Sequence, residues 1–331
     1  MKQLSQQVFQ PLSARLPNIQ ATVLPMKNVL VLGGSGFVGR HLCELLNRAG
    51  VYVTVATRRL PARSVQMLPF VTVVQADVHD NTVLCDLVRG HDAVVNLVAI
   101  LHGDQAAFDK VHVQLPRQLA HACVQAGVKR MVHVSALGAD QQGPSLYQRS
   151  KAQGEAALQS QVVHGLQLTV LRPGVIFGQD DAFINLFARL QSIAPVVPLA
   201  GAHTRFQPVW VQDVAQALLY ALQHRETIGQ VYALAGPEVF TLKQLVQHAG
   251  RWAGHARPVV ALPHALAYLQ ATLMELLPGP PLMSRDNLAS MQVDNVADDS
   301  LPGLKQLGVS AAARLQSVFP VVDNRQWFDK G

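Results

Sequence analysis

The feature that most constrains the fold of this 331-residue chain is a glycine-rich segment behind an apolar run. The run Asn28–Leu32 is typical of a buried strand, and it leads into the sequence Gly33-Gly34-Ser35-Gly36-Phe37-Val38-Gly39. An amphipathic helical pattern continues through Arg40–Ala49 and ends at Gly50. Strand, glycine turn and helix in this order predict the corner that holds a dinucleotide pyrophosphate.

Each residue type in the turn has a physical reason. We expect Gly33 to leave the strand through backbone angles that a side chain would forbid, and Gly36 to let backbone amides approach phosphate oxygens. Gly39 would allow close packing of the helix on the strand. The first N–H groups of the helix, together with the positive end of its dipole, would face the anion. The predicted phosphate-binding residues are Gly33, Ser35, Gly36, Phe37, Val38 and Gly39.

The end of the second predicted strand, Val51–Ala56, indicates which cofactor is bound. It lies about 20 residues beyond the glycines, where an NAD site usually carries an acidic residue. Here Arg58 and Arg59 follow Thr57 instead. Guanidinium groups pair bidentately with phosphates, so the two arginines favour the 2′-phosphate of NADP(H) over NAD(H). The alternative for one of the pair is a solvated surface charge.

Strand and helix patterns go on alternating, which predicts an α/β fold with a doubly wound parallel Rossmann sheet. The next strands are expected at Val71–Gln75, Ala93–Val98 and Arg130–Val134. Ligands bind beyond the carboxyl ends of such strands. The residues predicted beside the adenine and ribose are therefore Asp77, Val78, Val98 and Ala99. Asp77 has a second interpretation of equal weight, as the cap of a helix ahead of Asn81.

A candidate catalytic group follows the strand Arg130–Val134. Ser135 stands at the carboxyl end of that strand, and Tyr147 and Lys151 come 12 and 16 residues later. Residues four apart share one face of a helix, so the phenol and the ammonium can be neighbours. A nearby lysine cation would lower the high pKa of a tyrosine and make it a usable acid or base. Ser135 would hydrogen-bond a substrate carbonyl oxygen, which gives a proton-transfer unit beside a hydride carrier.

Composition excludes several other classes of protein. The net charge of +6 comes without a dense basic stripe, which disfavours nucleic-acid binding and fits an anionic cofactor. The three cysteines are odd in number and predict reduced thiols. No histidine or cysteine spacing is typical of a metal site, and no apolar run is long enough to span a membrane. We therefore expect a cytoplasmic protein.

The first 25 residues differ from the rest, because they contain prolines and basic residues but no acid. They lack the continuous apolar core of a secretory signal. We expect a flexible extension over residues 1–25, or an over-long reading frame whose real start is Met26.

The glycine turn, Ser135 and the Tyr147/Lys151 pair resemble the short-chain dehydrogenase/reductase superfamily, in its extended branch with the NAD-dependent epimerase/dehydratase-like fold. The segment Leu171–Gly178 resembles the strand and loop that close over the nicotinamide in this branch. The resemblance implies that Pro173 and Val175 contact the cofactor, together with Tyr147 and Lys151. It covers roughly residues 26 to 320.

Within the branch, three segments resemble the NADPH-binding accessory subunits of respiratory complex I and their bacterial relatives. They are His133–Ala139, Tyr147–Ala152 and Pro278–Ser284. This resemblance implies NADPH binding firmly and catalysis only weakly. It also implies a respiratory complex as a partner and a place at the periphery of the inner membrane.

The second half of the chain predicts a smaller part built beside the sheet. We expect residues 26–178 to form the nucleotide-binding core, and residues 179–331 to complete the sheet and add a small helix-rich C-terminal lobe for substrate or partner. Asp213 follows a short strand, so we expect it to be a helix N-cap. The apolar stripe Leu262, Leu266, Leu269, Leu273 and Leu276 predicts a buried helix face. Its alternatives are a lining for an apolar substrate pocket, or contact with a membrane or a partner.

Two functions are consistent with these features. The first is an NADP(H)-dependent oxidoreductase with Tyr147 as acid or base, Lys151 as its activator, and a small lipophilic or quinone-like carbonyl compound as substrate. The second is a non-catalytic subunit or redox sensor in which bound NADPH stabilises the folded protein within an assembly.

Overall fold

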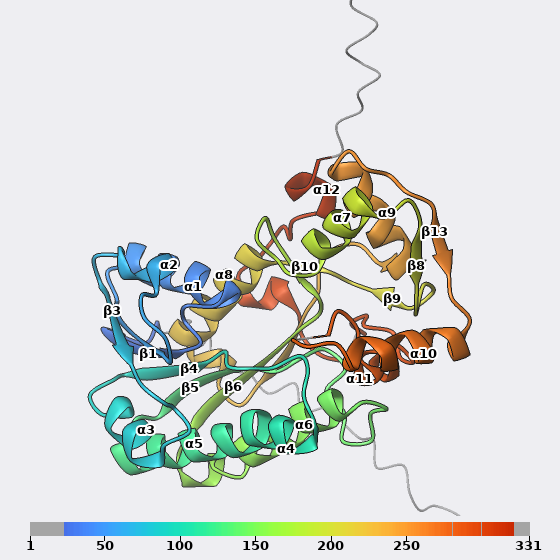
Figure 1. Cartoon of the computed structure of the whole chain (residues 1–331). Coiled ribbons are helices and arrows are strands. Elements are labelled where there is room, and N and C mark those ends of the chain that lie inside the picture. Colours follow the sequence, from blue (N-terminus) through green and yellow to red (C-terminus); the bar gives the residue numbers. More distant parts are fainter. Residues whose placement is uncertain (1–22, 280, 299, 321–331) are drawn as a thin grey trace, which may run out of the picture.

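The computed structural model describes residues 23–279, 281–298 and 300–320. Its centre is a seven-stranded sheet in the order β11-β6-β5-β4-β1-β2-β3 (Figure 1). Every neighbouring pair in this sheet is parallel. The strands are β1 Asn28–Leu32, β2 Tyr52–Thr57, β3 Val71–Gln75, β4 Ala93–Asn96, β5 Arg130–Val134, β6 Gln167–Pro173 and β11 Val231–Leu234. The predicted fold class is confirmed, although the fourth strand ends two residues earlier than expected.

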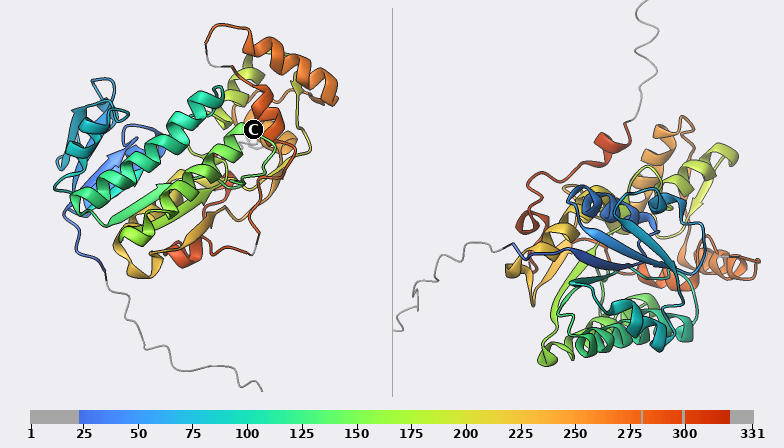
Figure 2. Two further views of the ribbon diagram at one scale, coloured as in Figure 1. Left: turned by 90° about the horizontal axis from the view of Figure 1, so that it is seen from below. Right: turned by 90° about the vertical axis from the view of Figure 1, so that its left-hand side faces the viewer.

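Helices cover both faces of the sheet because its strands are apolar on both sides. In β1, Val29 and Val31 belong to one buried cluster, and Leu30 and Leu32 belong to another. The first cluster lies under α1 (Phe37–Arg48), α2 (Arg63–Gln66) and α8 (Val211–Gln223). The second lies against α3 (Asn81–Val88), α5 (Leu115–Ala126) and α6 (Leu146–Gln159). Figure 2 shows these two helical layers on opposite sides of the strands.

The topological switch point of the sheet lies between β1 and β4. Ligands bind at this point in open α/β sheets, beyond the carboxyl ends of the strands. The chain leaves β1 toward β2 and β3, then returns to place β4, β5 and β6 on the other side. The segment after β4 contains α4 (Gln105–Asp109) and one turn of π-helix, η1 (Lys110–Gln114). The glycine turn after β1 and the loop after β4 therefore meet at the edge of the sheet that is formed by the carboxyl ends of its strands.

A smaller lobe stands beyond this edge, as the predicted fold class requires. Its core joins α7 (Ile184–Ile193) to α9 (Leu242–Trp252). Short strands complete it, in the pairs β7 (Ile176–Phe177) with β10 (Val209–Trp210), β8 (Val197–Leu199) with β13 (Val259–Ala261), and β9 (Arg205–Phe206) with β12 (Phe240–Thr241). Three further helices belong to this part of the chain, α10 (His264–Glu275), α11 (Arg285–Ser290) and α12 (Leu315–Val318). The remaining short turns are η2 (Val162–His164), η3 (Arg225–Thr227) and η4 (Leu304–Leu307).

Two predictions about single elements are wrong. Asp213 is not a helix N-cap, because α8 begins at Val211 with Trp210 as its N-cap. The Asp213 carboxylate lies buried in the first turn and accepts a hydrogen bond from the backbone N–H of Ala313 at 2.8 Å. This contact joins α8 to the C-terminal segment 100 residues later in the chain.

The leucine stripe of α10 is not a core face. Leu266, Leu269, Leu273 and Leu276 are exposed, and the buried residues of the helix are Ala267 and Ala271. Leu262, the first member of the predicted stripe, precedes the helix and is partly buried. The helical period was therefore correct, but the small residues face the protein and the leucines face away from it. The expectation about residues 1–25 concerns mainly residues 1–22, which lie outside the described residues.

Candidate nucleotide-binding and catalytic site

The turn after β1 has the geometry that the glycines predicted. Gly33 has a φ of +81°, and a Cβ at Gly39 would lie only 2.3 Å from the carbonyl oxygen of Gly33. Glycine at position 39 thus lets α1 start directly on the turn. Within the described chain, no side chain caps α1, whose N-cap is Gly36. Its first N–H groups are therefore available to an anion.

The two arginines lie where the second strand ends. Arg58 and Arg59 follow β2, both are exposed, and neither forms an ion pair within the described ranges. The structure adds Arg63, an exposed residue that begins the short helix α2. The neighbouring Ser64 hydroxyl hydrogen-bonds the carbonyl oxygen of Ser35 at 3.4 Å, so α2 stands beside the glycine turn. Sequence reasoning missed Arg63 because no motif marks it.

Asp77 does not cap a helix. The N-cap of α3 is Asp80, whose carboxylate accepts from the amides of Thr82 and Val83, so the capping interpretation of Asp77 is wrong. The Asp77 carboxylate is exposed and accepts a hydrogen bond from the amide of His79 at 3.0 Å. Burial lowers the pKa of His79, Lys110 and Arg58 lower it further, and Asp77 raises it. Asp77 and Arg58 are therefore both close enough to His79 to affect its charge.

The other predicted cofactor residues stand at the same edge of the sheet. Val98 and Ala99 follow β4, and the amide of Val98 donates to the side-chain oxygen of Asn96 at 3.2 Å. Pro173 ends β6, and its carbonyl oxygen accepts from the amide of Leu137 in the loop after β5. Val175 lies in the next loop, where its carbonyl oxygen accepts from the amide of Val209.

The candidate catalytic residues come from β5 and α6. Tyr147 and Lys151 both lie in the first half of α6, and Ser135 follows β5 directly. The Lys151 ammonium donates to the carbonyl oxygen of Val134 at 2.9 Å, which holds it next to Ser135. The Ser135 hydroxyl is 4% exposed and has no hydrogen-bond partner among the described residues. A buried hydroxyl left unpaired in this way is suited to a ligand oxygen.

The pKa of Tyr147 differs from the sequence-based expectation. Burial raises the pKa of Tyr147 to about 12, whereas Lys151 was expected to lower it. Desolvation of the phenolate is the cause, so the phenol is protonated at neutral pH. Burial also lowers the pKa of Lys151 to about 8, with Glu155 opposing the change.

A buried histidine that sequence reasoning missed supports the tyrosine. His112 lies in the π-helical turn η1, and its ring is 5.5 Å from that of Tyr147 at an angle of 83°. Its Nδ1 lies 2.9 Å from the Ser150 hydroxyl, and its Nε2 accepts from the amide of Ile100 at 3.1 Å. Burial, followed by the charge of Lys151, lowers the pKa of His112 to about 3. The histidine is therefore neutral at neutral pH.

Close packing holds η1 against α6. A Cβ at Gly154 would lie 2.0 Å from the carbonyl oxygen of His112, so α6 can approach η1 only because this position is glycine. Turns of π-helix occur often at functional sites, and here the turn carries the histidine that contacts Tyr147. Neither the π turn nor the role of Gly154 has a local sequence signal.

The N-terminus of α6 is closed by a residue from the far end of the chain. Ser145 caps the helix through the amide of Gln148, and the carboxylate of Asp286 accepts from the amides of Leu146 and Tyr147 at 2.6 and 3.1 Å. Asp286 lies in α11, 139 residues after Tyr147. The lobe is thus fastened to the helix that carries the candidate catalytic residues.

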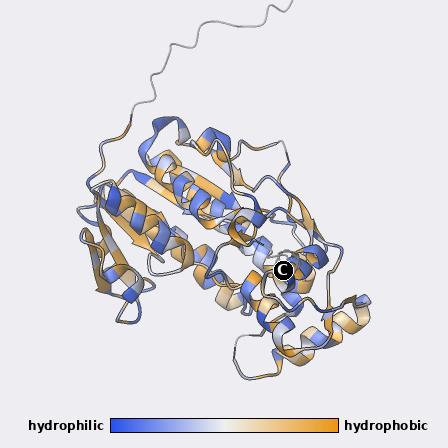
Figure 3. Cartoon of the chain, turned by 90° about the horizontal axis from the view of Figure 1, so that it is seen from above, coloured by the Kyte–Doolittle hydropathy of each residue, from blue (hydrophilic) through white to orange (hydrophobic). Residues whose placement is uncertain are grey.

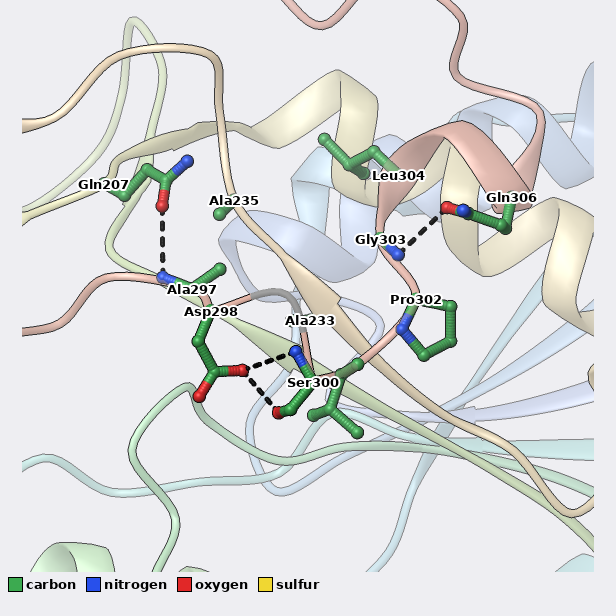
Figure 4. Close-up of a pocket in the computed structure, with 11 residues that line it drawn as sticks. Gln207, Ala233, Ala235, Ala297, Asp298, Ser300, Pro302, Gly303, Leu304 and Gln306 are labelled. Atoms are coloured by element: carbon green, nitrogen blue, oxygen red, sulfur yellow. Dashed lines mark hydrogen bonds between the residues drawn. The ribbon is translucent and has the colours of Figure 1, made fainter.

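A separate cavity of about 400 Å³ lies along the edge strand β11 (Figure 4). Its polar groups bond to one another. The Asp298 carboxylate accepts from the amide and hydroxyl of Ser300, and the Gln207 side chain accepts from the amide of Ala297. Three strands separate β11 from β1, and none of the residues that line the cavity is a predicted site residue.

Comparison with known proteins identifies the family and the fold. The family model of the NAD dependent epimerase/dehydratase family matches residues 29–235, which contain the glycine turn, Ser135, Tyr147 and Lys151. The chain belongs to this family. It is an extended short-chain dehydrogenase/reductase, as the resemblance of its motifs implied.

Relatives in the family differ in what their names describe. The chain is 31% identical over 287 residues to the mouse protein NADH dehydrogenase [ubiquinone] 1 alpha subcomplex subunit 9, mitochondrial, over 84% of this chain and 75% of the relative. It is 29% identical to sterol demethylase protein B of Methylococcus capsulatus, over 72% of this chain and 78% of the relative. The family thus includes a relative named as a respiratory-complex subunit and one named for a sterol reaction.

A solved structure agrees with the fold. UDP-glucose 4-epimerase of Thermus thermophilus in complex with NAD has a TM-score of 0.61 at 22% identity, covering 80% of this chain and 99% of that chain. Membership of the family implies a nicotinamide cofactor. The residues of this chain fit such a group, because in the part of the chain that the structure describes no side chain caps α1 and the Ser135 hydroxyl has no partner, which leaves them available to an anion and to a ligand oxygen.

Proposed function

We propose that this protein is an NADP(H)-dependent oxidoreductase that reduces the carbonyl group of a lipophilic substrate. The observation that carries the proposal is the buried Ser135 hydroxyl, which has no hydrogen-bond partner among the described residues. Ser135 lies directly after β5 and next to Lys151, and β5 precedes the helix of Tyr147. The sterol reaction in the name of one relative supports a lipophilic substrate. In this proposal residues 26–178 bind the nucleotide, and residues 179–331 complete the sheet and close over the substrate.

The proposed chemistry assigns one role to each side chain. The bound cofactor supplies a hydride from its nicotinamide ring. Ser135 donates a hydrogen bond to the substrate carbonyl oxygen and orients it. Tyr147, whose phenol is protonated at neutral pH, donates its proton to the same oxygen as negative charge develops there. Lys151 stabilises the resulting phenolate and holds the nicotinamide ribose.

Tyr147→Phe tests this assignment. With NADPH and a hydrophobic carbonyl probe such as decanal or a 3-ketosteroid, the variant should lose at least about a thousandfold in kcat, because the proton donor is gone. Its dissociation constant for NADPH should stay within about twofold of the wild-type value. A variant that oxidises NADPH as fast as the wild type would contradict the role of Tyr147.

The preference for NADP(H) rests on Arg58 and Arg59, with Arg63 as a third cation beside them. Arg58→Ala should weaken NADPH binding by about 10- to 100-fold and NADH binding by less than about threefold, because only NADPH has a 2′-phosphate. Calorimetric titration with both nucleotides measures the difference. Arg48→Ala, which removes an exposed arginine at the far end of α1, is the matched control. Equal losses for both nucleotides would show that Arg58 does not select the cofactor.

A second candidate function is a subunit that keeps NADPH as a structural ligand in a respiratory assembly at the inner membrane. The subunit name of the mouse relative favours it. A ligand that binds only the folded state stabilises that state by mass action. Protein purified without added nucleotide would then retain NADPH through extensive dialysis. An enzyme would release it and exchange it within a catalytic cycle.

A further inference from the structure

The first turn of α1 carries an arginine close to the open end of the helix. Arg40 lies three residues after Phe37, with which the helix begins. Side chains on an α-helix lean toward its N-terminus, and the guanidinium of Arg40 lies over the ring of Phe37, 5.5 Å from its centroid. The helix buries its apolar face with Leu42 and Leu46, and Arg40 stands on the more polar side. Figure 3 shows this alternation of hydrophobic and hydrophilic residues along the helices that cover the sheet.

The charge of Arg40 is already paired with an acid from the lobe. The Nη2 atom of Arg40 lies 2.7 Å from Oδ2 of Asp180, which stands in the loop between β7 and α7. The Arg40 side chain is 24% exposed and that of Asp180 is 70% exposed. The loop touches the same turn of α1 a second time, because a Cβ at Gly178 would lie 3.1 Å from the ring of Phe37. A loop of the lobe therefore contacts the phosphate-binding helix directly.

Asp180 has no part in holding its own loop together. The loop is held from within by Asp181, which is 4% exposed and whose carboxylate accepts from the amides of Gly178 and Ile184 at 3.1 and 2.5 Å. The side-chain amide of Asn185 donates to the carbonyl oxygen of Asp181 at 3.0 Å. Within the described ranges, the side chain of Asp180 forms its one hydrogen bond with Arg40. Its carboxylate can leave Arg40 without loss of a turn or a cap.

An anion at the start of α1 would meet both members of this pair. The guanidinium of Arg40 would attract it, whereas the carboxylate of Asp180 would repel it and already occupies the guanidinium. An exposed ion pair contributes only about 0–1 kcal/mol, because water screens it. A guanidinium forms short, charge-assisted and often bidentate hydrogen bonds with phosphate oxygens. A pyrophosphate at the open amides is therefore the stronger partner for Arg40.

We propose that Arg40 is a pyrophosphate-binding residue that Asp180 occupies until the nucleotide binds. On binding, the guanidinium exchanges the Asp180 carboxylate for a phosphate oxygen, so Asp180 lowers the affinity for the nucleotide. This role differs from that of Arg58 and Arg59, because the pyrophosphate is common to NADPH and NADH. The inference rests on the nucleotide binding of the proposed function, and it does not depend on the reduction of a carbonyl group.

Calorimetric titration of the full chain with NADPH and with NADH tests the proposal. Arg40→Ala should weaken the binding of both nucleotides by about tenfold and by the same factor. Asp180→Asn keeps the size of the side chain and removes its charge, so it should tighten the binding of both by about three- to tenfold. In the Arg40→Ala background, Asp180→Asn should change either affinity by less than about twofold, because no cation is left for the carboxylate to occupy.

Matched controls separate this role from damage to the fold. Asp86→Asn removes an exposed acid from a comparable pair, in which Asp86 of α3 lies 2.6 Å from Arg89, and both affinities should stay within about twofold of the wild-type values. Arg40→Lys keeps the positive charge and should bind both nucleotides at least about threefold more tightly than Arg40→Ala. The melting temperature of each variant without nucleotide should stay within about 2 °C of the wild type, as expected for an exposed pair.

The outcomes distinguish this inference from the proposed function. If the wild type binds both nucleotides and Asp180→Asn binds them no more tightly, or Arg40→Ala binds them as tightly, the inference about this pair is overturned alone. A loss confined to NADPH in Arg40→Ala would also overturn it, because Arg40 would then serve the 2′-phosphate. A wild-type protein that binds neither nucleotide would overturn the inference together with the cofactor of the proposed function. Failure of the reductase assay would leave all the titrations unaffected.

Discussion

The N-termini of α1 and α6 lie at the same edge of the sheet, but one is open and the other is closed. In the described structure, α1 begins at a glycine N-cap without any side-chain hydrogen bond. In α6, by contrast, Ser145 and Asp286 satisfy the amides of Leu146, Tyr147 and Gln148, and the aspartate adds a negative charge. The positive end of a helix attracts anions only when nothing else neutralises it.

The difference assigns separate tasks to the two helices. The open end of α1 suits a pyrophosphate, whereas the capped end of α6 fixes a helix whose side chains have to be held in position. The same backbone dipole thus serves as a binding group in one place and as a support in the other. Three changes would break or sharpen this comparison.

Gly36→Asp should have the largest effect, because it gives α1 the carboxylate that α6 already has. The backbone at Gly36 has a φ of −80°, which an L-residue adopts, and the new carboxylate would cap the helix. We expect NADPH affinity to fall about a thousandfold, or about 4 kcal/mol, through lost amide contacts and repulsion. Calorimetric titration measures it. Gly36→Ala adds a Cβ that would lie 3.2 Å from the carbonyl oxygen of Gly33, but it adds neither a cap nor a charge, so it should lose less than the aspartate variant. Unchanged binding by the aspartate variant would refute the open-end interpretation.

Acid should destabilise the packing beside α6. His112 is buried with a pKa of about 3. Between pH 6.5 and that value the unfolded chain binds a proton that the folded chain does not, so stability falls as the pH falls. Going from pH 6.5 to pH 4 should cost about 3 kcal/mol for this residue, and His133, whose pKa is also lowered by burial, adds to the loss. Urea unfolding at several pH values, with His112→Asn and the exposed His121→Asn as control, measures it. An equal slope for the wild type and His112→Asn would contradict the assignment.

Asp286→Ala should have the smallest effect, because it opens α6 without touching the nucleotide. Loss of the cap should lower the free energy of unfolding by about 1 kcal/mol and speed hydrogen exchange at the amides of Leu146 and Tyr147. Asp286→Asn, which keeps one acceptor oxygen, should lose about half as much. Asp80→Ala removes a comparable cap from α3 and should leave exchange in α6 unchanged. The same exchange pattern in both alanine variants would show that Asp286 does not hold α6.

How well each feature could be predicted follows from how local its cause is. The strands, the glycine turn and the positions of Ser135, Tyr147 and Lys151 depend on neighbours within a few residues, so periodicity and spacing predicted them. The positive φ of Gly33 is an example, because a strand that turns directly into a helix needs it.

Features with distant causes were not predictable. The cap of α6 by Asp286 joins residues 140 positions apart, and the approach of α6 to η1 depends on Gly154 in one helix and His112 in another. The prediction that the leucine stripe of α10 is buried was wrong for a related reason. Its period shows that one face is apolar, but which face meets the protein depends on what packs there, and here Ala267 and Ala271 do.

The small lobe is built from stretches that are separated in the chain. Its core takes Phe177–Phe206, then Leu242–Val259, then Leu315–Phe319, while α8 and β11 between the first two belong to the sheet. The polypeptide consequently passes several times between the small lobe and the sheet. A protease that nicks one crossing would leave both fragments associated, and no single continuous gene fragment encodes the lobe.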